Sequence, residues 1–185
     1  RESVDRMLCL LPFEAEIYKA AGIDAMCVGH PLVDELQQLP AVEELRASIG
    51  LPSNKTLLAV LPGSREGEVR HLMPVFVDAM QLLQARHTNL HFVIPAANAE
   101  RHNQIESVLQ PAALPVSLIR GQGREVMRCS DAILIASGTA TLEAMLLRKP
   151  MVISYRMASL SWGILSRLVQ TPHVGLPNVL DGEEI

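Results

Sequence analysis

Short apolar runs alternate with amphipathic stretches along most of this sequence. From residue 56 onwards, apolar runs occupy residues 56–61, 90–95, 116–119, 132–136 and 151–155. The stretches between these runs have helical patterns, and 68–86 is the clearest, because Leu72, Phe76 and Met80 recur there on one helical face. Near-continuous apolar strands that alternate with helices predict an α/β fold, in which helices cover both faces of a parallel sheet.

The first 52 residues have a different pattern. Short strands are predicted at 7–11 and 25–28, with a helix at 12–21 between them. A polar stretch with several prolines follows, and it contains one helical pattern at 41–49.

This change of pattern predicts three parts. Residues 1–30 are the end of one domain, 31–52 are a linker, and 53–185 are a second domain. The sequence opens on Arg1 rather than on Met, and it ends where a further helix is about to start. We therefore expect it to be part of a longer protein.

Composition and charge narrow the class of protein. Hydrophobic residues make up 49% of the chain and charged residues 19%, as in ordinary globular proteins. A net charge of −4 without a basic stripe argues against a nucleic-acid partner. No apolar stretch reaches the roughly 18 residues of a membrane span. Two of the three cysteines, Cys9 and Cys27, lie in strand-like runs, which favours buried free thiols in the cytoplasm.

The most informative stretch runs from Asp131 to Glu143. An apolar run ends at Ser137-Gly138-Thr139, and a helical pattern follows directly. The first amides of a helix lack partners within the helix and favour an anion. Glu143 lies four residues beyond Thr139, about 6 Å further along the same helix face. This arrangement suits a nucleoside diphosphate, with phosphates at the helix start and ribose hydroxyls on Glu143. The alternative is a capped helix in which Glu143 pairs with Arg148 or Lys149.

A second turn, Pro62-Gly63-Ser64-Arg65, lies between the strand 56–61 and the helix 68–86. It matches neither a Walker A loop nor a dinucleotide-binding fingerprint. It still brings a flexible turn, a hydroxyl group and a guanidinium group to the carboxyl end of a strand, where open sheets bind ligands. The alternative is a tight turn that exposes an arginine.

Two further turns are weaker candidates. Gln122 and Gly123 follow the strand 116–119, and a base could lie against their small-residue backbone, although a plain turn fits equally well. Asn178 could donate to a phosphate or sugar, or could hold its own loop. The histidines and acidic residues do not show metal-ligand spacing, so we predict no bound metal.

These motifs, taken together and in order, match those of a known family. They are Leu11-Pro12-Phe13-Glu14 with Tyr18; Gly29-His30-Pro31; Leu61 to Arg65 with Glu68-Val69; Gly123-Arg124-Glu125; Ala136 to Glu143; Pro150-Met151-Val152 with Tyr155-Arg156; and Leu176-Pro177-Asn178. The chain resembles the lipid-A-disaccharide synthase family, which are glycosyltransferases with two Rossmann-like domains facing a cleft (the GT-B arrangement). The resemblance covers essentially the whole chain and is strongest for the donor-binding, C-terminal half of such enzymes.

The resemblance implies an inverting enzyme that needs no metal and no cofactor. Such an enzyme transfers a diacylglucosamine unit from UDP-2,3-diacylglucosamine to 2,3-diacylglucosamine 1-phosphate, giving the disaccharide precursor of lipid A. It also implies that the general base lies in the N-terminal domain, so that this chain alone is inactive. That domain would also contact the cytoplasmic face of the inner membrane, and a homodimer is one expected assembly.

The resemblance assigns the UDP-sugar site to three turns and Asn178. Arg65, with Gly63 and Ser64, and the helix start at Gly138 and Thr139, with Ser137 and Ala140, would hold the diphosphate. Glu143 would bind the ribose, Gln122 and Gly123 would border the uracil, and Asn178 would face the diphosphate or the sugar.

Two alternative functions stay open at this stage. One is another GT-B enzyme that uses UDP-N-acetylglucosamine, such as the undecaprenyl-linked muramyl-peptide transferase or the 2-epimerase. The epimerase would need Asp-Ser-Gly-Gly where this chain has Ala136-Ser137-Gly138-Thr139. The other alternative is a UDP-sugar-binding module without catalytic activity.

Overall fold

The computed structural model describes residues 4–156 and residue 178. The chain divides into two compact units, Arg1–Gln38 (unit 1) and Leu39–Ile185 (unit 2). The division falls inside the predicted linker 31–52, and residues 39–52 group with the second unit. The assignment of the three predicted parts to domains of a longer enzyme stays a prediction.

Unit 1 is a parallel strand pair with one helix packed on it. Its elements are β1 (Arg6–Cys9), α1 (Pro12–Ala20), β2 (Asp24–Cys27) and α2 (Leu32–Gln37). A small core forms where α1 meets the strands, around the buried residues Cys9, Ala15 and Ala25. The helix α2 was not expected from the sequence, and Cys27, which was expected to be buried, is exposed.

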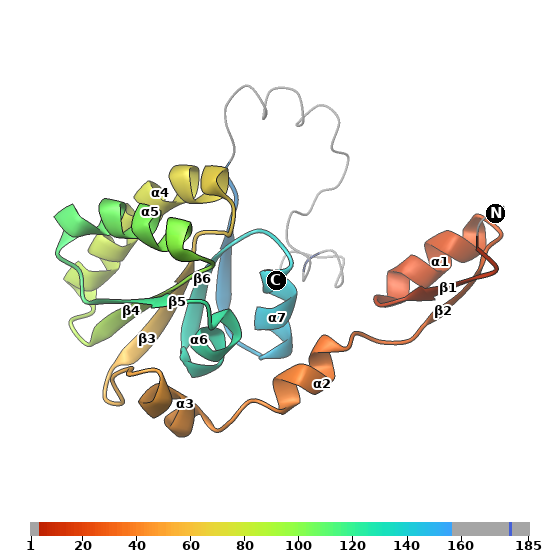
Figure 1. Cartoon of the computed structure of the whole chain (residues 1–185), viewed down its shortest axis with the longest axis horizontal. Coiled ribbons are helices and arrows are strands. Elements are labelled where there is room, and N and C mark those ends of the chain that lie inside the picture. The colour runs from red at the N-terminus through yellow and green to blue at the C-terminus, as the bar shows by residue number, and fades with distance from the viewer. Residues whose placement is uncertain (1–3, 157–177, 179–185) are drawn as a thin grey trace. The chain divides into compact units, whose positions relative to one another are not determined.

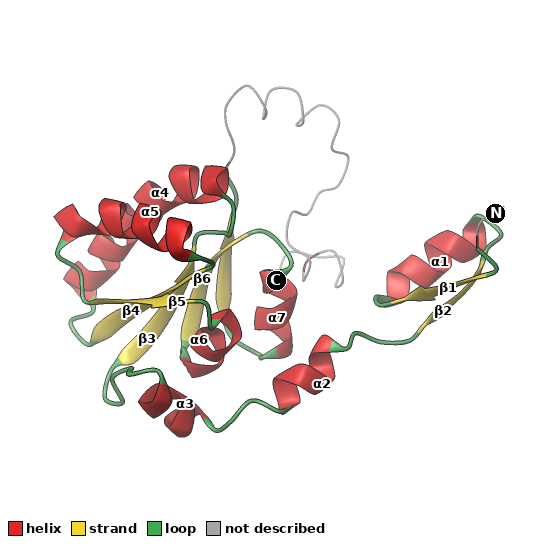
Figure 2. Ribbon diagram, viewed as in Figure 1, coloured by secondary structure: helices red, strands yellow, loops and turns green. Residues whose placement is uncertain are grey.

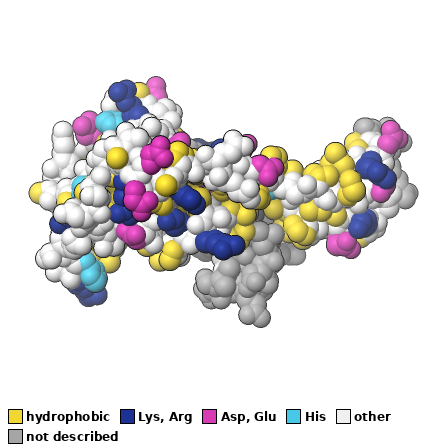
Figure 3. Space-filling model, turned by 90° about the horizontal axis from the view of Figure 1, so that it is seen from below, with side chains coloured by type: hydrophobic (Ala, Val, Ile, Leu, Met, Phe, Trp, Pro, Cys, Tyr) yellow, Lys and Arg dark blue, Asp and Glu magenta, His cyan; other side chains and the backbone are white. Residues whose placement is uncertain are grey.

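Hydrophobic side chains gather on the surface of unit 1 (Figure 3). Leu8 and Met26 are register partners on β1 and β2, and they are 58% and 49% exposed. Because side chains alternate across a strand, these two lie on the face opposite to Cys9 and Ala25, which pack against α1. A two-stranded sheet with one helix thus leaves one apolar face uncovered.

Unit 2 is a parallel sheet with helices on both faces (Figures 1 and 2). Its strands are β3 (Thr56–Leu61), β4 (Leu90–Ala96), β5 (Val116–Arg120), β6 (Ala132–Ala136) and β7 (Met151–Ser154). Its helices are α3 (Val42–Ser48), α4 (Glu66–Arg86), α5 (Ala99–Leu109), the 3-10 turn Gln110–Ala112, α6 (Gly123–Cys129) and α7 (Ala140–Leu146). The strands lie in the order β5-β4-β3-β6-β7, and all neighbours are parallel.

The core explains why the apolar runs form central strands. On one face, α4 packs Leu72, Phe76 and Met80 against the sheet, as their spacing predicted. The alternate strand residues, such as Ala59 and Ile133, are also fully or almost fully buried, because α6 and α7 cover the other face. The predicted class of fold, a parallel sheet with helices on both faces, is confirmed.

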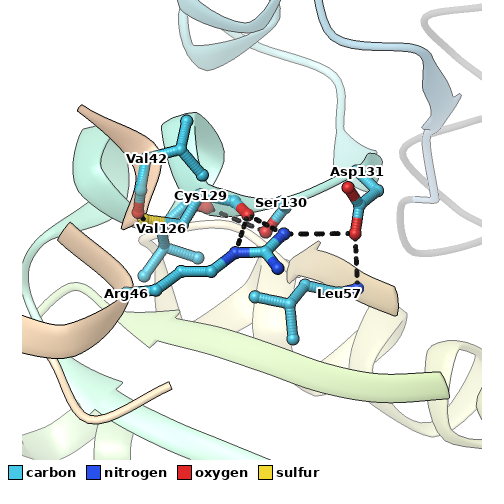
Figure 4. A network of polar contacts seen from close by, with 7 residues as sticks. All are labelled: Val42, Arg46, Leu57, Val126, Cys129, Ser130 and Asp131. Atoms are coloured by element: carbon cyan, nitrogen blue, oxygen red, sulfur yellow. Dashed lines mark hydrogen bonds and ion pairs between the residues drawn. The ribbon is translucent and has the colours of Figure 1, made fainter. Parts of the chain in front are cut away.

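A polar network ties α3 to the amino ends of the strands (Figure 4). Arg46 donates to the carbonyl oxygen of Cys129 from Nε (3.0 Å) and Nη2 (2.7 Å), and it pairs with Asp131 at 3.3 Å. The carboxylate of Asp131 also accepts the amide of Leu57 at 2.8 Å. Only 14% of the Arg46 side chain is exposed, so these bonds hold α3 against the rest of unit 2.

Candidate functional site

A cavity of about 380 Å³ opens at the carboxyl ends of the central strands. The turns after β3 and β6 form opposite walls, and the ends of β4 and β5 contribute small residues. The lining consists of Leu61, Gly63, Ser64, Arg65, Glu68, Pro95, Ala96, Ala97, Gly121, Gly123, Ile135, Ala136, Ser137, Gly138, Thr139 and Ala140. Eight of the eleven predicted site residues therefore lie around one cavity, although they come from three separate segments.

The turn after β3 is held in shape by Glu68, a residue that was not among the predicted site residues. Its carboxylate oxygen Oε2 accepts the amides of Ser64 (2.9 Å) and Arg65 (3.1 Å), and Oε1 accepts Nη1 of Arg65 (2.9 Å). Glu68 is the third residue of α4, the usual place for an acidic capping residue. That spacing from Arg65 is the signal in the sequence by which Glu68 could have been found.

Arg65 lies at the edge of the cavity, with its side chain 84% exposed. A guanidinium group has five N–H donors, and Glu68 engages only one of its nitrogens. Arg65 can therefore bind an anion in the cavity while it stays paired with Glu68.

The turn after β6 is fixed by backbone bonds at the edge of the sheet. The amide of Ser137 donates to the carbonyl oxygen of Ser154 at the end of β7 (2.9 Å). Thr141 donates to the carbonyl oxygen of Gly138 from its amide (3.1 Å) and its hydroxyl group (2.7 Å). The helix α7 that follows has seven residues, so its dipole adds less than that of a long helix.

Glu143 pairs with Arg124, not with Arg148 or Lys149. Nε of Arg124 lies 3.4 Å from Oε2 of Glu143, and their side chains are 42% and 22% exposed. Glu143 is one helical turn behind Ala140 and is not among the described residues that line the cavity. The pair joins the first turn of α6 to α7, and so connects two of the predicted motifs.

The turn between β5 and α6 places Gly121 and Gly123 on the cavity wall. Gly121 and Gln122 both have left-handed backbone conformations, with φ of 68° and 56°, and Gly121 donates to the carbonyl oxygen of Ala96 (2.7 Å). Gln122 is exposed beside the cavity rather than part of its described lining. Its predicted contact with a base stays a prediction.

The remaining predictions concern Asn178 and metals. Asn178 is helical and half-buried, while Leu176 and Pro177 of its motif lie outside the described residues. Within residues 4–156 and 178, no three His, Cys, Asp or Glu side chains are grouped so that they could hold a metal ion. No helix in this part of the chain is both long and apolar enough to cross a membrane.

A second hollow, of about 950 Å³, lies at the opposite, amino ends of the strands. Apolar side chains such as Leu58, Leu82 and Val152 dominate its lining, next to the last turns of α4. Most of its polar residues, such as Arg86, His87 and Asn89, come from one segment at the end of α4, and no glycine turn is among the described residues that line it, whereas the first cavity combines small residues, backbone amides and Arg65.

Comparison with known proteins identifies the family. A family model described as lipid-A-disaccharide synthetase matches residues 1–185. The chain belongs to the lipid-A-disaccharide synthase family. The lipid-A-disaccharide synthase of Alcanivorax borkumensis is 49% identical over 187 residues, covering 100% of this chain and 49% of that protein. The lipid-A-disaccharide synthase of Pseudomonas savastanoi pv. phaseolicola is 47% identical over 180 residues, covering 97% and 47%. The chain thus spans about half the length of these curated relatives.

Several solved structures share the fold of this lipid-A-disaccharide synthase chain at low sequence identity. MnaA of S. aureus, in a co-structure with UDP, has a TM-score of 0.64 at 16% identity and covers 97% of this chain and 51% of that chain. UDP-GlcNAc 2-epimerase from Neisseria meningitidis, bound to UDP-GlcNAc, has a TM-score of 0.62 at 16% identity, with coverages of 96% and 52%. WaaG, a glycosyltransferase involved in lipopolysaccharide biosynthesis, has a TM-score of 0.53 at 17% identity, with coverages of 94% and 51%. These likenesses confirm the predicted GT-B type of fold.

Proposed function

We propose that this chain is the donor-binding half of a lipid-A-disaccharide synthase. The complete enzyme then transfers a diacylglucosamine unit from UDP-2,3-diacylglucosamine to 2,3-diacylglucosamine 1-phosphate, with inversion and without a metal. The observation on which the proposal rests is the cavity at the carboxyl edge of the sheet. Two motifs 70 or more residues apart, at Gly63–Arg65 and Ser137–Ala140, form its walls in a chain of this family.

In this proposal the diphosphate lies between the two walls. Arg65 binds it on one side, and the backbone at Gly138 and Thr139 faces it on the other. A guanidinium group holds phosphate oxygens in two parallel hydrogen bonds, and this makes it the main source of charge for the site. Gly123 leaves room for the uracil, with Gln122 beside it, and Asn178 faces the diphosphate or the sugar.

Glu143 binds the ribose in this proposal. Its carboxylate has two oxygens with lone pairs for about four hydrogen bonds, and Arg124 engages only Oε2. The carboxylate can therefore accept ribose hydroxyl groups while it stays paired with Arg124. Because a carboxylate accepts hydroxyl groups through charge-assisted bonds, each bond contributes roughly 1.5–3 kcal/mol.

The chemistry itself is assigned to a domain that precedes unit 2. We propose that unit 1 contributes the last strands of this N-terminal domain, whose other parts supply the general base and the contact with the cytoplasmic face of the inner membrane. The uncovered apolar face of unit 1, with Leu8 and Met26, supports further packing of this kind. A homodimer of the complete enzyme is part of the same proposal.

Titration calorimetry with UDP tests the donor site directly. We expect Arg65→Ala and Glu143→Ala each to weaken UDP binding at least about tenfold, since each removes a charge-assisted contact. Arg70→Ala and Glu100→Ala are matched controls, because both side chains are exposed on helices and neither lines the cavity. Unchanged UDP affinity in both site variants would contradict the assignment.

A transfer assay on the full-length protein tests the reaction. We expect disaccharide 1-phosphate and UDP to form from the two diacylated glucosamine substrates. Turnover of an undecaprenyl-linked acceptor instead, or epimerisation of UDP-N-acetylglucosamine, would identify one of the alternative enzymes. UDP binding without any turnover would favour a module that only binds the sugar nucleotide.

A further inference from the structure

Glu68 joins the two parts of the turn after β3 that face the cavity. It accepts the amides of Ser64 and Arg65 with one oxygen and the guanidinium group of Arg65 with the other. The Glu68 side chain is 28% exposed and lines the cavity, whereas Arg65 is 84% exposed. The partly buried carboxylate of Glu68 thus fixes the backbone of the turn at Ser64 and Arg65, and it also fixes the direction of the exposed Arg65 side chain.

The turn and Glu68 are built around each other. Gly63 has a φ of 108°, a backbone conformation that residues with a side chain rarely adopt. A Cβ atom placed there would also lie 2.6 Å from Cβ of Glu68. The turn can therefore pass this close to α4 only with glycine at position 63. The amides of Ser64 and Arg65, directly before the first residue of the 21-residue helix α4, already donate to Glu68. What the turn offers to a ligand in the cavity is then mainly Arg65.

The helix α1 in unit 1 has a similar acidic cap, and comparing the two caps shows what is particular to Glu68. Glu14, the third residue of α1, accepts the amides of Leu10 and Leu11. The residue before α1 is Leu11, so that carboxylate caps a helix without holding a cation. The residue before α4 is Arg65, and Glu68 both caps the helix and holds the guanidinium group.

We propose that Glu68 is a positioning residue of the donor site, which orients Arg65 toward the diphosphate of the UDP-sugar. This inference rests on the proposed donor-binding function. Holding the guanidinium group in one place removes rotamer freedom before the ligand arrives, so less entropy is lost on binding. Arg65 and the two amides balance the negative charge of Glu68. The carboxylate therefore stabilises the turn without making the electrostatic potential of the cavity unfavourable for a diphosphate.

Titration calorimetry of UDP with variants of the complete chain tests this inference. We expect Glu68→Gln to weaken UDP binding about tenfold, because the charged contact with Arg65 is lost. Glu66→Gln is the matched control: it removes the same charge from the first turn of α4, but its side chain pairs with Arg70 and not with the turn. Its effect should stay below about twofold.

A double-mutant cycle separates positioning from simple helix capping. If Glu68 acts through Arg65, adding Glu68→Gln to Arg65→Ala should change UDP affinity by less than about twofold. Thermal unfolding by circular dichroism defines a temperature at which every variant is folded. Should Glu68→Gln not fold, Glu68→Asp replaces it; it keeps the charge on a shorter side chain and should weaken binding by several fold.

Three outcomes would overturn the inference. Equal losses in the wild-type and Arg65→Ala backgrounds would mean that Glu68 only caps α4. Unchanged affinity would mean that Arg65 needs no orientation, and tighter binding would mean that the carboxylate repels the diphosphate. If the wild-type chain itself does not bind UDP, the proposed function fails and the inference fails with it.

Discussion

At the scale of single residues, adding one methyl group at Gly63 should have a clear effect on the free energy of unfolding. Its φ of 108° and the nearness of Glu68 both disfavour any side chain. We expect Gly63→Ala to lower the free energy of unfolding by about 1–3 kcal/mol, from backbone strain and displacement of Glu68. Urea denaturation followed by circular dichroism measures this change.

Gly67→Ala is the matched control for this prediction. Gly67 lies inside α4, and a Cβ atom there would meet nothing within 4 Å. Because alanine favours helices more than glycine does, this variant should be neutral or stabilising by up to about 1 kcal/mol. Equal behaviour of the two variants would show that the turn can move away from Glu68 at little cost.

The pair of Arg124 and Glu143 leads to a prediction about ligand discrimination. If Arg124 holds Glu143 in place for the ribose, Arg124→Ala should reduce the preference for UDP over 2′-deoxy-UDP. We expect Glu143→Gln to reduce this preference as well, and the double variant to lose little more than either single one, because the two side chains act as a unit. Competition binding with both nucleotides measures the ratio. An additive loss in the double variant would mean that Arg124 contacts the nucleotide independently of Glu143.

Half of the cavity-lining residues could be located from the sequence, but the side chains that pair with the site residues could not. Gly63, Ser64 and Arg65 could be placed because they follow an apolar run, and parallel strands bring such ends to one edge of the sheet. The pairing of Glu143 with Arg124 depends on the left-handed turn at Gly121 and Gln122, which directs α6 toward α7. Local pattern contains no information on that direction, so the alternative capped-helix interpretation named only the nearer cations Arg148 and Lys149 as partners of Glu143.

At the scale of elements, the helices and strands with many buried residues could be predicted from the sequence. The strand β3 has the predicted bounds, because a central strand is apolar along its whole length. The helix α4 begins two residues earlier than predicted, at Glu66, where capping by Glu68 rather than hydrophobic spacing sets the start. The helix α2 was missed because it is six residues long and buries only Leu32 and Leu36, a single pair at helical spacing.

The attachment of α3 to the rest of unit 2 gives a prediction at this scale. Arg46→Met keeps most of the apolar length of the side chain but leaves the carbonyl oxygen of Cys129 without its two donor contacts. We expect a loss of about 1–3 kcal/mol in the free energy of unfolding, typical of a largely buried hydrogen bond from a charged group. Urea denaturation is again the measurement. Arg70→Met, at an exposed position on α4, should change stability by less than about 0.5 kcal/mol, and an equal loss there would refute the role of Arg46.

At the scale of the whole molecule, the chain has two compact units, and the residues of the proposed UDP site all belong to unit 2. UDP binding should therefore stabilise unit 2 directly. Each unit contains one buried cysteine: Cys9 in unit 1 and Cys129 in unit 2. Burial raises the pKa of the Cys129 thiol, against the opposing effect of Arg46, so this thiol should react only when unit 2 opens. Replacing the exposed Cys27 by serine would leave one buried thiol as a probe in each unit.

Thiol labelling of the Cys27→Ser variant can therefore test site and architecture together. At a UDP concentration of about 100 times Kd, binding should stabilise unit 2 by about 2.7 kcal/mol and slow the labelling of Cys129 roughly hundredfold. The labelling of Cys9 should not change, because the proposed UDP site consists of residues of unit 2 alone. Mass spectrometry of the labelled peptides gives both rates in one experiment. Equal protection of both thiols would mean that the units open as one, and no protection of Cys129 would mean either that UDP does not bind unit 2 or that α6 opens without disturbing the cavity.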